Sequence, residues 1–231
     1  MCGIVAYIGS EQARPVLLEG LKRLEYRGYD SAGVAMLNGG LHVARTVGRV
    51  RVLEQQIDGD SHFDGTIGIA HTRWATHGPP TEANAHPHRD DATRGHGIVL
   101  VHNGIIENYA SLRTWLMEKG HKFVSETDTE VLVHLVGELY EGDLSAAVRA
   151  ALREVEGAYA IAVICQSQPD VLVAARRGSP LLIGVSEHGY IVASDAQAIV
   201  GHTSRVIDLD EEIVATVTRT TFHTANLDNV E

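Results

Sequence analysis

Hydrophobic positions at the start of the chain predict a strand, a helix and a hairpin. An apolar run over residues 2–8 that stops at Gly9 is typical of a buried strand. Residues 11–25 carry apolar side chains at helical spacing. Residues 33–37 and 41–47 flank the sequence Asn-Gly-Gly, which favours a tight hairpin. The pattern therefore predicts antiparallel strands with a helix packed on them.

Further along the chain, the pattern predicts two more strands, three helices and a series of short strands. The strands are expected at 66–72 and 97–102, the helices at 111–118, 128–140 and 143–155, and the short strands at 158–165, 171–175, 181–185, 190–193 and 213–217. The polar stretch between the first two strands has no period, and loops of that length are usually functional. One α+β domain over residues 1–219 is the simplest arrangement, and the polar residues 220–231 are expected to begin a linker.

Composition excludes several classes of protein. The chain has 231 residues, of which 44% are hydrophobic and 21% charged, as in ordinary globular domains. Its 19 basic and 30 acidic side chains give a net charge of -11, so no basic surface is expected to hold nucleic acid. No apolar stretch is long enough for a membrane span or a signal peptide, and we expect a cytoplasmic protein. Two cysteines, Cys2 and Cys165, indicate no disulfide framework.

Cys2 is a candidate nucleophile if Met1 is removed. A cysteine at this position is weak support for catalysis by itself, since a buried structural thiol is the commoner use. Without Met1, however, Cys2 carries a thiol of pKa about 8.5 and an α-amine of pKa about 7.7. The partly neutral amine can accept the proton of the thiol, so nucleophile and base would belong to one residue. With Met1 retained, the same nitrogen is a planar amide that cannot act as a base.

Five polar segments follow Cys2 in a recognisable order. They are YRGYDSAG from Tyr26, TRWATHG from Thr72, NAHPH from Asn84, HNGIIENY from His102 and SETDTE from Ser125. Together with Cys2, the sequences and spacing of these segments resemble those of the class II, N-terminal-nucleophile glutamine amidotransferases. Among these, the resemblance is to the glutaminase domain of glucosamine-6-phosphate synthases. The resemblance covers nearly the whole chain. It implies a four-layer αββα sandwich, with two antiparallel sheets between helical layers.

The resemblance also implies roles for residues that suit the chemistry. Arg73 matches the residue that binds the α-carboxylate of glutamine, and a planar guanidinium can donate two parallel hydrogen bonds to that group. Asp128 matches the residue that binds the α-ammonium. Together they would hold the side-chain amide at the thiol of Cys2. Asn103 and Gly104 match the oxyanion hole, where a side-chain amide and a backbone N–H stabilise the developing negative oxygen.

Four further residues are assigned to the substrate site by the same resemblance. Arg27 matches an arginine beside the nucleophile, with a surface ion pair as the alternative. Trp74 matches a tryptophan that helps to gate ammonia, with a buried aromatic anchor as the alternative. Thr76 and His77 fall in the loop that closes over glutamine in the family.

Histidines are frequent in the middle of the chain and raise the question of a metal site. They are His71, His77, His86, His88, His96 and His102. No H-E-x-x-H pair, cysteine pair or helical register accompanies them, so their spacing does not favour zinc. Hydrogen bonds that order loops are the expected use. No metal and no other cofactor is predicted.

The leading functional hypothesis is hydrolysis of L-glutamine through a γ-glutamyl thioester on Cys2. In the family, the ammonia passes to a sugar-phosphate isomerase domain that binds fructose 6-phosphate, and that domain is absent from these 231 residues. The full-length protein is expected to form a homo-oligomer. Two alternatives stay open. One is another class II amidotransferase, such as the phosphoribosyl pyrophosphate enzyme or asparagine synthetase, and the other is a non-catalytic glutamine sensor.

Overall fold

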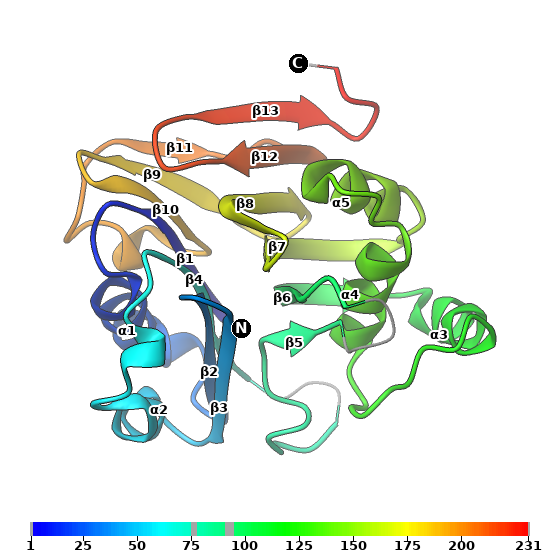
Figure 1. Ribbon diagram of the computed structural model, residues 1–231, viewed down its shortest axis with the longest axis horizontal. Helices are drawn as coiled ribbons and strands as arrows, with labels where there is room; N and C mark the ends of the chain where they lie inside the picture. Colours follow the sequence, from blue (N-terminus) through cyan, green and yellow to red (C-terminus); the bar gives the residue numbers. More distant parts are fainter. Residues whose placement is uncertain (1, 75–77, 91–94, 231) are drawn as a thin grey trace.

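Two antiparallel sheets face each other in the computed structural model, which describes residues 2–74, 78–90 and 95–230 (Figure 1). The strands of the first sheet are β1 (Gly3–Gly9), β2 (Ser31–Leu37), β3 (Leu41–Val47), β4 (Ile67–Arg73), β9 (Leu182–Ser186), β10 (Gly189–Ala193) and β11 (Val206–Asp208). They lie in the order β11-β9-β10-β1-β4-β2-β3. The N-terminal strand β1 is therefore central, between β10 and β4.

The second sheet is built mainly from the later part of the chain. Its strands are β5 (His88–Arg89), β6 (Ile98–Ile106), β7 (Gly157–Cys165), β8 (Gln168–Arg177), β12 (Ile213–Val217) and β13 (Phe222–Asn226). They lie in the order β13-β12-β8-β7-β6-β5. The helices are α1 (Ala13–Leu24), α2 (Val50–Ile57), α3 (Tyr109–Glu118), α4 (Asp128–Glu138) and α5 (Leu144–Arg153), and short 3₁₀ turns cover Glu25–Arg27, Ser61–Phe63 and Ala196–Ala198.

Alternating side chains of the central strands fill two different apolar layers. In β1, Ile4, Ala6 and Ile8 lie in the layer between the two sheets. Val5 and Tyr7 point to the opposite face and pack in the layer under α1 and α2. Because successive side chains of a strand leave the sheet on opposite faces, a run that is apolar at every position belongs in a sheet covered on both sides.

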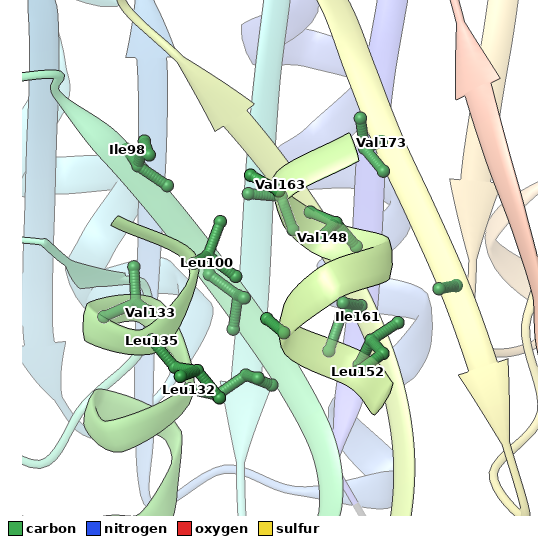
Figure 2. Packing of buried hydrophobic residues seen from close by; sticks show 14 of the residues in the cluster. Ile98, Leu100, Leu132, Val133, Leu135, Val148, Leu152, Ile161, Val163 and Val173 are labelled. Atoms are coloured by element: carbon green, nitrogen blue, oxygen red, sulfur yellow. The ribbon is translucent and has the colours of Figure 1, made fainter. Parts of the chain in front are cut away.

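The outer face of the second sheet is covered by α4 and α5. In Figure 2, Leu132 of α4 lies below Leu100 of β6, and Leu152 of α5 lies beside Ile161 of β7; all four belong to one buried cluster. Leu132 is fully buried, and burial of such a side chain contributes about 1.5–3 kcal/mol. The layer order is helix, sheet, sheet, helix, which confirms the predicted α+β class and its four-layer sandwich. No helix in the described ranges is long and apolar enough to cross a bilayer.

The ordered sheet extends past the boundary expected at residue 219. Strand β13 pairs with β12 along its whole length, for example Ala215 with Thr224, within the segment expected to begin a linker. Its side chains are partly or fully exposed, because it lies at the edge of the sheet. An edge strand needs no buried face, so the polar sequence gave no sign of pairing.

Helix α4 is the most deeply buried helix and its first turn is capped. Residues from Asp128 to Gly137 are all buried, because β6 lies on one side of the helix and α3 and α5 lie on others. The Thr127 side chain accepts a hydrogen bond from the backbone N–H of Glu130, as N-cap residues do. Glu130 in turn accepts from the backbone N–H of Val124 at 2.9 Å and of Ser125 at 2.7 Å. The start of α4 is thus tightly anchored.

Candidate active site

The predicted site residues converge where β1, β4 and β6 meet the first turn of α4. Gly3 of β1 pairs with Thr72 of β4, which places Cys2 beside the end of β4. One pocket is lined by Cys2, Arg73, Trp74, His86, His102, Gly104, Thr127, Asp128 and Thr129. Strands from both sheets and a helix N-terminus therefore contribute to a single site. A larger hollow of about 490 Å³, on the surface near Leu37 and Arg219, contains none of these residues.

The Cys2 thiol lies against the backbone of Trp74. The Trp74 N–H donates a hydrogen bond to Sγ at 3.3 Å, and Sγ lies 3.7 Å from the Trp74 carbonyl oxygen. Burial raises the pKa of the Cys2 thiol, although the Trp74 hydrogen bond and the charge of Arg73 oppose this effect. A thiol with a raised pKa is mostly protonated at neutral pH, so a base must take its proton before it can attack.

Arg73 is held by the chain that follows it. Its guanidinium donates to the carbonyl oxygens of Gly78 and Pro79, both at 3.3 Å, and the residue is only 5% exposed. Burial lowers the pKa of Arg73, and the negative charges of Asp30 and Asp128 oppose that shift. The cation therefore faces Asp128 across the pocket, and two anchored donors fix the plane of its guanidinium.

The YRGYD segment packs on the backbone of Arg73. The Asp30 N–H donates to the Arg73 carbonyl oxygen at 3.0 Å. A Cβ at Gly28 would lie 2.8–2.9 Å from backbone atoms of Arg73 and Trp74, closer than real contacts allow. Only glycine permits this approach, so Gly28 helps to place the backbone that contacts Cys2. The motif was visible in the sequence, but this backbone role was not.

Asp128 is the first residue of α4 and is 7% exposed. One carboxylate oxygen accepts the backbone N–H of Ile106 at 2.8 Å, which ties the helix to the end of β6. The partial positive charge of the helix N-terminus favours a carboxylate at this position. Asp128 is therefore a fixed anion on the side of the pocket opposite Arg73, suited to an ammonium group.

Asn103 is oriented by His71. Because His71 is completely buried and its Nε2 lies 2.9 Å from Asn103 Oδ1, that nitrogen must carry the proton and donate. The Asn103 oxygen is thus held, and its Nδ2 faces Cys2, donating to the Cys2 carbonyl oxygen at 3.1 Å. An amide nitrogen has two hydrogens, so one stays available for a charged oxygen beside the thiol. The sequence pointed to Asn103 but not to the residue that sets its orientation.

Gly104 has a backbone conformation that excludes a side chain. Its φ of 138° lies in the region that favours glycine, and a Cβ would clash with the Ala158 carbonyl oxygen on the neighbouring strand β7. The residue continues β6, where it pairs with Tyr159. Glycine therefore lets the strand reach the pocket without closing it.

Three buried imidazoles support this side of the pocket. His71 stacks on His86 with ring centroids 4.1 Å apart, and His86 Nδ1 accepts the backbone N–H of His102 at 3.3 Å. His102 Nδ1 lies 3.0 Å from the Thr129 hydroxyl. Burial lowers the pKa of all three, to about 3 for His71, so the rings are neutral at cellular pH. They order the loop and β6 by hydrogen bonds, as the sequence predicted.

The remaining predicted residues differ in their relation to the pocket. Arg27 donates to the Asp195 carboxylate at 2.7 Å and is not among the residues that line the pocket. Trp74 lines the pocket, yet it is 45% exposed and packs edge-on against Tyr29, so the expected buried anchor is not found. Thr76 and His77 lie outside the described residues.

The pocket is narrow. Its free volume is about 30 Å³, which is room for a single water molecule but not for an amino acid. The charged and polar groups are already in place around it. A ligand of the size of glutamine needs more room than this volume provides.

Known proteins resemble this chain in sequence. The sequence profile of a family described as glutamine amidotransferase domain matches residues 52–230. The glutamine–fructose-6-phosphate aminotransferase (isomerizing) of Chlorobaculum tepidum is 50% identical over 237 residues, which cover 100% of this chain and 38% of that protein. The protein of the same name from Caldanaerobacter subterraneus subsp. tengcongensis is 50% identical, over 94% of this chain and 35% of its own length. The chain thus spans well under half of these relatives.

Solved structures share the fold at lower sequence identity. The glutamine phosphoribosylpyrophosphate amidotransferase of B. subtilis superposes with a TM-score of 0.86 at 26% identity, over 98% of this chain and 49% of the other. A structure described as the allosteric regulatory enzyme of purine biosynthesis gives a TM-score of 0.87 at 27% identity, with the same coverage of the two chains.

Proposed function

The chain belongs to the class II glutamine amidotransferases, and we propose that it hydrolyses L-glutamine to L-glutamate and ammonia through a γ-glutamyl thioester on Cys2. One observation carries the proposal. A thiol, a buried guanidinium and a buried carboxylate line one pocket, from Cys2, Arg73 and Asp128. These are the groups needed to attack an amide and to bind both charged groups of an amino acid.

The reaction begins when the α-amine of Cys2, freed by removal of Met1, takes the proton of the thiol. The sulfur then bonds to the side-chain carbonyl carbon of glutamine, and the carbonyl oxygen becomes negative. The Asn103 amide and the Gly104 N–H donate to that oxygen, and such donors are worth about 3–4 kcal/mol each. The ammonium of Cys2 returns its proton to the leaving nitrogen, and the C–N bond breaks to release ammonia. Water then hydrolyses the thioester, and the sulfur recovers its proton.

Arg73 and Asp128 determine which amide is attacked. The guanidinium binds the α-carboxylate and the carboxylate binds the α-ammonium, so the side chain of glutamine extends toward Cys2. The proximity gained in this way lowers the barrier without changing the chemistry of the thiol. Trp74 is proposed to help to gate ammonia, Thr76 and His77 to close over the substrate, and Arg27 to support the Cys2 region through Asp195. These four roles remain predictions.

The test measures glutamate formation and the covalent intermediate together. Wild-type protein, shown by intact mass to lack Met1, should release glutamate and should gain one adduct from an electrophilic glutamine analogue. Cys2→Ala should do neither while it keeps its fold. Cys165→Ala is the matched control, and it should retain both, because Cys165 is buried on strand β7. Substantial turnover by folded Cys2→Ala would refute the mechanism.

Retention of Met1 gives a second test of the same step. Protein that keeps Met1 should be nearly inactive, and treatment with a methionine aminopeptidase should restore turnover. If unprocessed protein were equally fast, another base would be required. His71 is poorly suited to that role, because burial lowers the pKa of its ring to about 3.

We further propose that the ammonia is used for an amino sugar. The curated relatives that share about half of this sequence are named for fructose 6-phosphate, whereas the structural relatives named for purine synthesis share 26% and 27%. In a longer protein, a sugar-phosphate isomerase domain would receive the ammonia, and that protein is expected to be a homo-oligomer. A reducing compartment such as the cytoplasm would keep the Cys2 thiol free.

A non-catalytic glutamine sensor is the alternative to an enzyme. It would bind glutamine through Arg73 and Asp128 and leave Cys2 unused. Glutamate formation by the wild-type chain, abolished in Cys2→Ala, excludes it.

A further inference from the structure

A second cluster of polar side chains lies against the second and third turns of α4, apart from the pocket. It consists of Asp90 after strand β5, His121 after helix α3, and His134 on α4. The three side chains are each about 1% exposed. Burial of a carboxylate and two imidazoles is costly unless each is given a charged or hydrogen-bonding partner.

Both imidazoles present Nδ1 to the same carboxylate. His134 Nδ1 lies 2.9 Å from Asp90 Oδ1, and His121 Nδ1 lies 3.8 Å from that oxygen. One ligand atom from each residue can be chosen so that all three lie within 4.8 Å of one another. Among the described residues, Asp90 Oδ2, His121 Nδ1 and His134 Nε2 are buried without a hydrogen-bond partner. Each of the three side chains therefore keeps one potential ligand atom that makes no hydrogen bond.

Carboxylates also lie behind both histidines. His121 Nε2 lies 3.1 Å from Glu138 Oε2, and His134 Nε2 lies 3.8 Å from Glu130 Oε1. In metal sites the ring nitrogen that does not bind the ion usually faces a carboxylate, which fixes the tautomer and increases the basicity of the ligand nitrogen. Each Nε2 here has that arrangement, and each Nδ1 is left toward Asp90.

The backbone of α4 is shaped to admit the Asp90 carboxylate. A Cβ at Gly137 would clash with its Oδ1 and Oδ2 atoms. Glycine inside a helix costs about 1 kcal/mol relative to alanine. The space that this glycine leaves lets an anion from another segment sit directly on the buried face of the helix.

We propose that Asp90, His121 and His134 bind one divalent cation such as Zn²⁺. The cation would attach two segments to α4, one that precedes α3 and one that follows it. Two imidazole nitrogens and a carboxylate oxygen suit Zn²⁺, Co²⁺ or Ni²⁺, whereas Mg²⁺ and Ca²⁺ prefer oxygen ligands alone. Bonds of about 2.0–2.1 Å in a tetrahedral site separate ligand atoms by about 3.3 Å. The three side chains need to close by about 1.5 Å at most from their present limit of 4.8 Å.

This site differs from the histidine set that the sequence raised and set aside, because none of those histidines belongs to it. His134 lies six residues after Asp128 on α4, so a bound cation would hold the middle of the helix whose first residue is Asp128.

The test uses Co²⁺ as a spectroscopic probe on the full chain, freed of metal by a chelator. The Cys2→Ala background removes the thiol and avoids binding at the chain terminus. One equivalent of Co²⁺ should produce the intense visible bands of a four-coordinate site, and one equivalent of Zn²⁺ should abolish them. Zn²⁺ should also raise the melting temperature. A wild-type chain that shows neither saturable bands nor a rise in melting temperature overturns the proposal.

Variants identify the ligands. Asp90→Asn and His134→Gln should each lose the bands, and Glu138→Gln should keep their shape while affinity falls about 10–100-fold. His62→Gln is the matched control, since His62 Nδ1 makes the same contact with Asp60 at 2.8 Å but on the surface, and it should bind Co²⁺ as before. Unchanged bands in folded Asp90→Asn and His134→Gln would refute this ligand set. If those variants do not fold, the outcome with the wild-type chain decides.

Discussion

The buried imidazole of His71 should make the stability of the fold depend on pH in the acid range. Burial lowers the pKa of His71 from 6.5 to about 3, so the folded protein keeps this ring neutral where the unfolded chain protonates it. Because the pKa of His71 is lower in the folded state, its neutral ring contributes fully to the free energy of unfolding above pH 6.5. This contribution is lost as the pH falls toward 3. Replacement by glutamine removes the titration and retains an amide donor that can reach Asn103.

The expected change in the free energy of unfolding follows from the proton uptake of the unfolded state. Between about pH 8 and pH 5 the unfolded His71 takes up nearly one proton and the folded residue takes up almost none. The free energy of unfolding of the wild type should therefore fall by about 2 kcal/mol more than that of His71→Gln over this range. Any pH-independent cost of the substitution cancels, because each protein is compared with itself. The quantity compared is the change in its free energy of unfolding between the two pH values.

Urea unfolding at several pH values, followed by circular dichroism, measures this difference. Val101→Ala is the control, since it removes volume from a fully buried position on β6 and should lower stability equally at every pH. His86→Gln should reproduce the effect of His71→Gln, because burial also lowers the pKa of His86. Equal acid sensitivity of the wild type and His71→Gln would show that His71 is not held neutral in the folded protein.

Three further predictions concern the pocket and the second cysteine. Asn103→Ala should lower kcat about 10²–10³-fold with little change in KM, since its amide is needed most when the oxygen is charged; a pure KM effect would contradict this role. Arg73→Lys and Asp128→Asn should each raise KM for glutamine and lower kcat/KM at least about tenfold; unchanged kinetics in both would refute their assignment. Cys165→Ala should keep full activity and lose about 1–2 kcal/mol in urea unfolding, because only packing and a 3.3 Å contact with the His96 carbonyl oxygen are removed; an inactive folded variant would contradict it.

Elements with a buried periodic face could be located from the sequence. The strand expected at 213–217 is β12 without a shift, and the helix expected to begin at 143 is α5, whose N-cap Asp143 accepts the Ala146 N–H at 3.0 Å. Helix α2 was missed although Val50, Leu53 and Ile57 form one buried face, because only eight residues carry the pattern. Strand β6 was predicted to end at 102 but continues to Ile106, since Asn103 and Gly104 have the composition of a turn and yet pair with β7.

The site was predictable where chemistry restricts the residue type and unpredictable where only packing does. Arg73 and Asp128 could be assigned from motifs. Local periodicity could not show that His71 would meet Asn103, since they come from strands of different sheets. The cluster of Asp90 and His121 is still harder to predict, because each residue stands alone in a polar segment. They meet only when their segments pack against α4. Contacts between different layers of the sandwich depend on the whole fold, so a short stretch of sequence does not predict them.

The central position of β1 has a consequence for the order of events during synthesis. Strand β1 leaves the ribosome before both of its neighbours, because β4 and β10 end at Arg73 and Ala193. At about 5–20 residues per second, the second partner appears roughly 10 s or more after β1. During that interval β1 has an unpaired edge, and a slower translation rate would lengthen the interval.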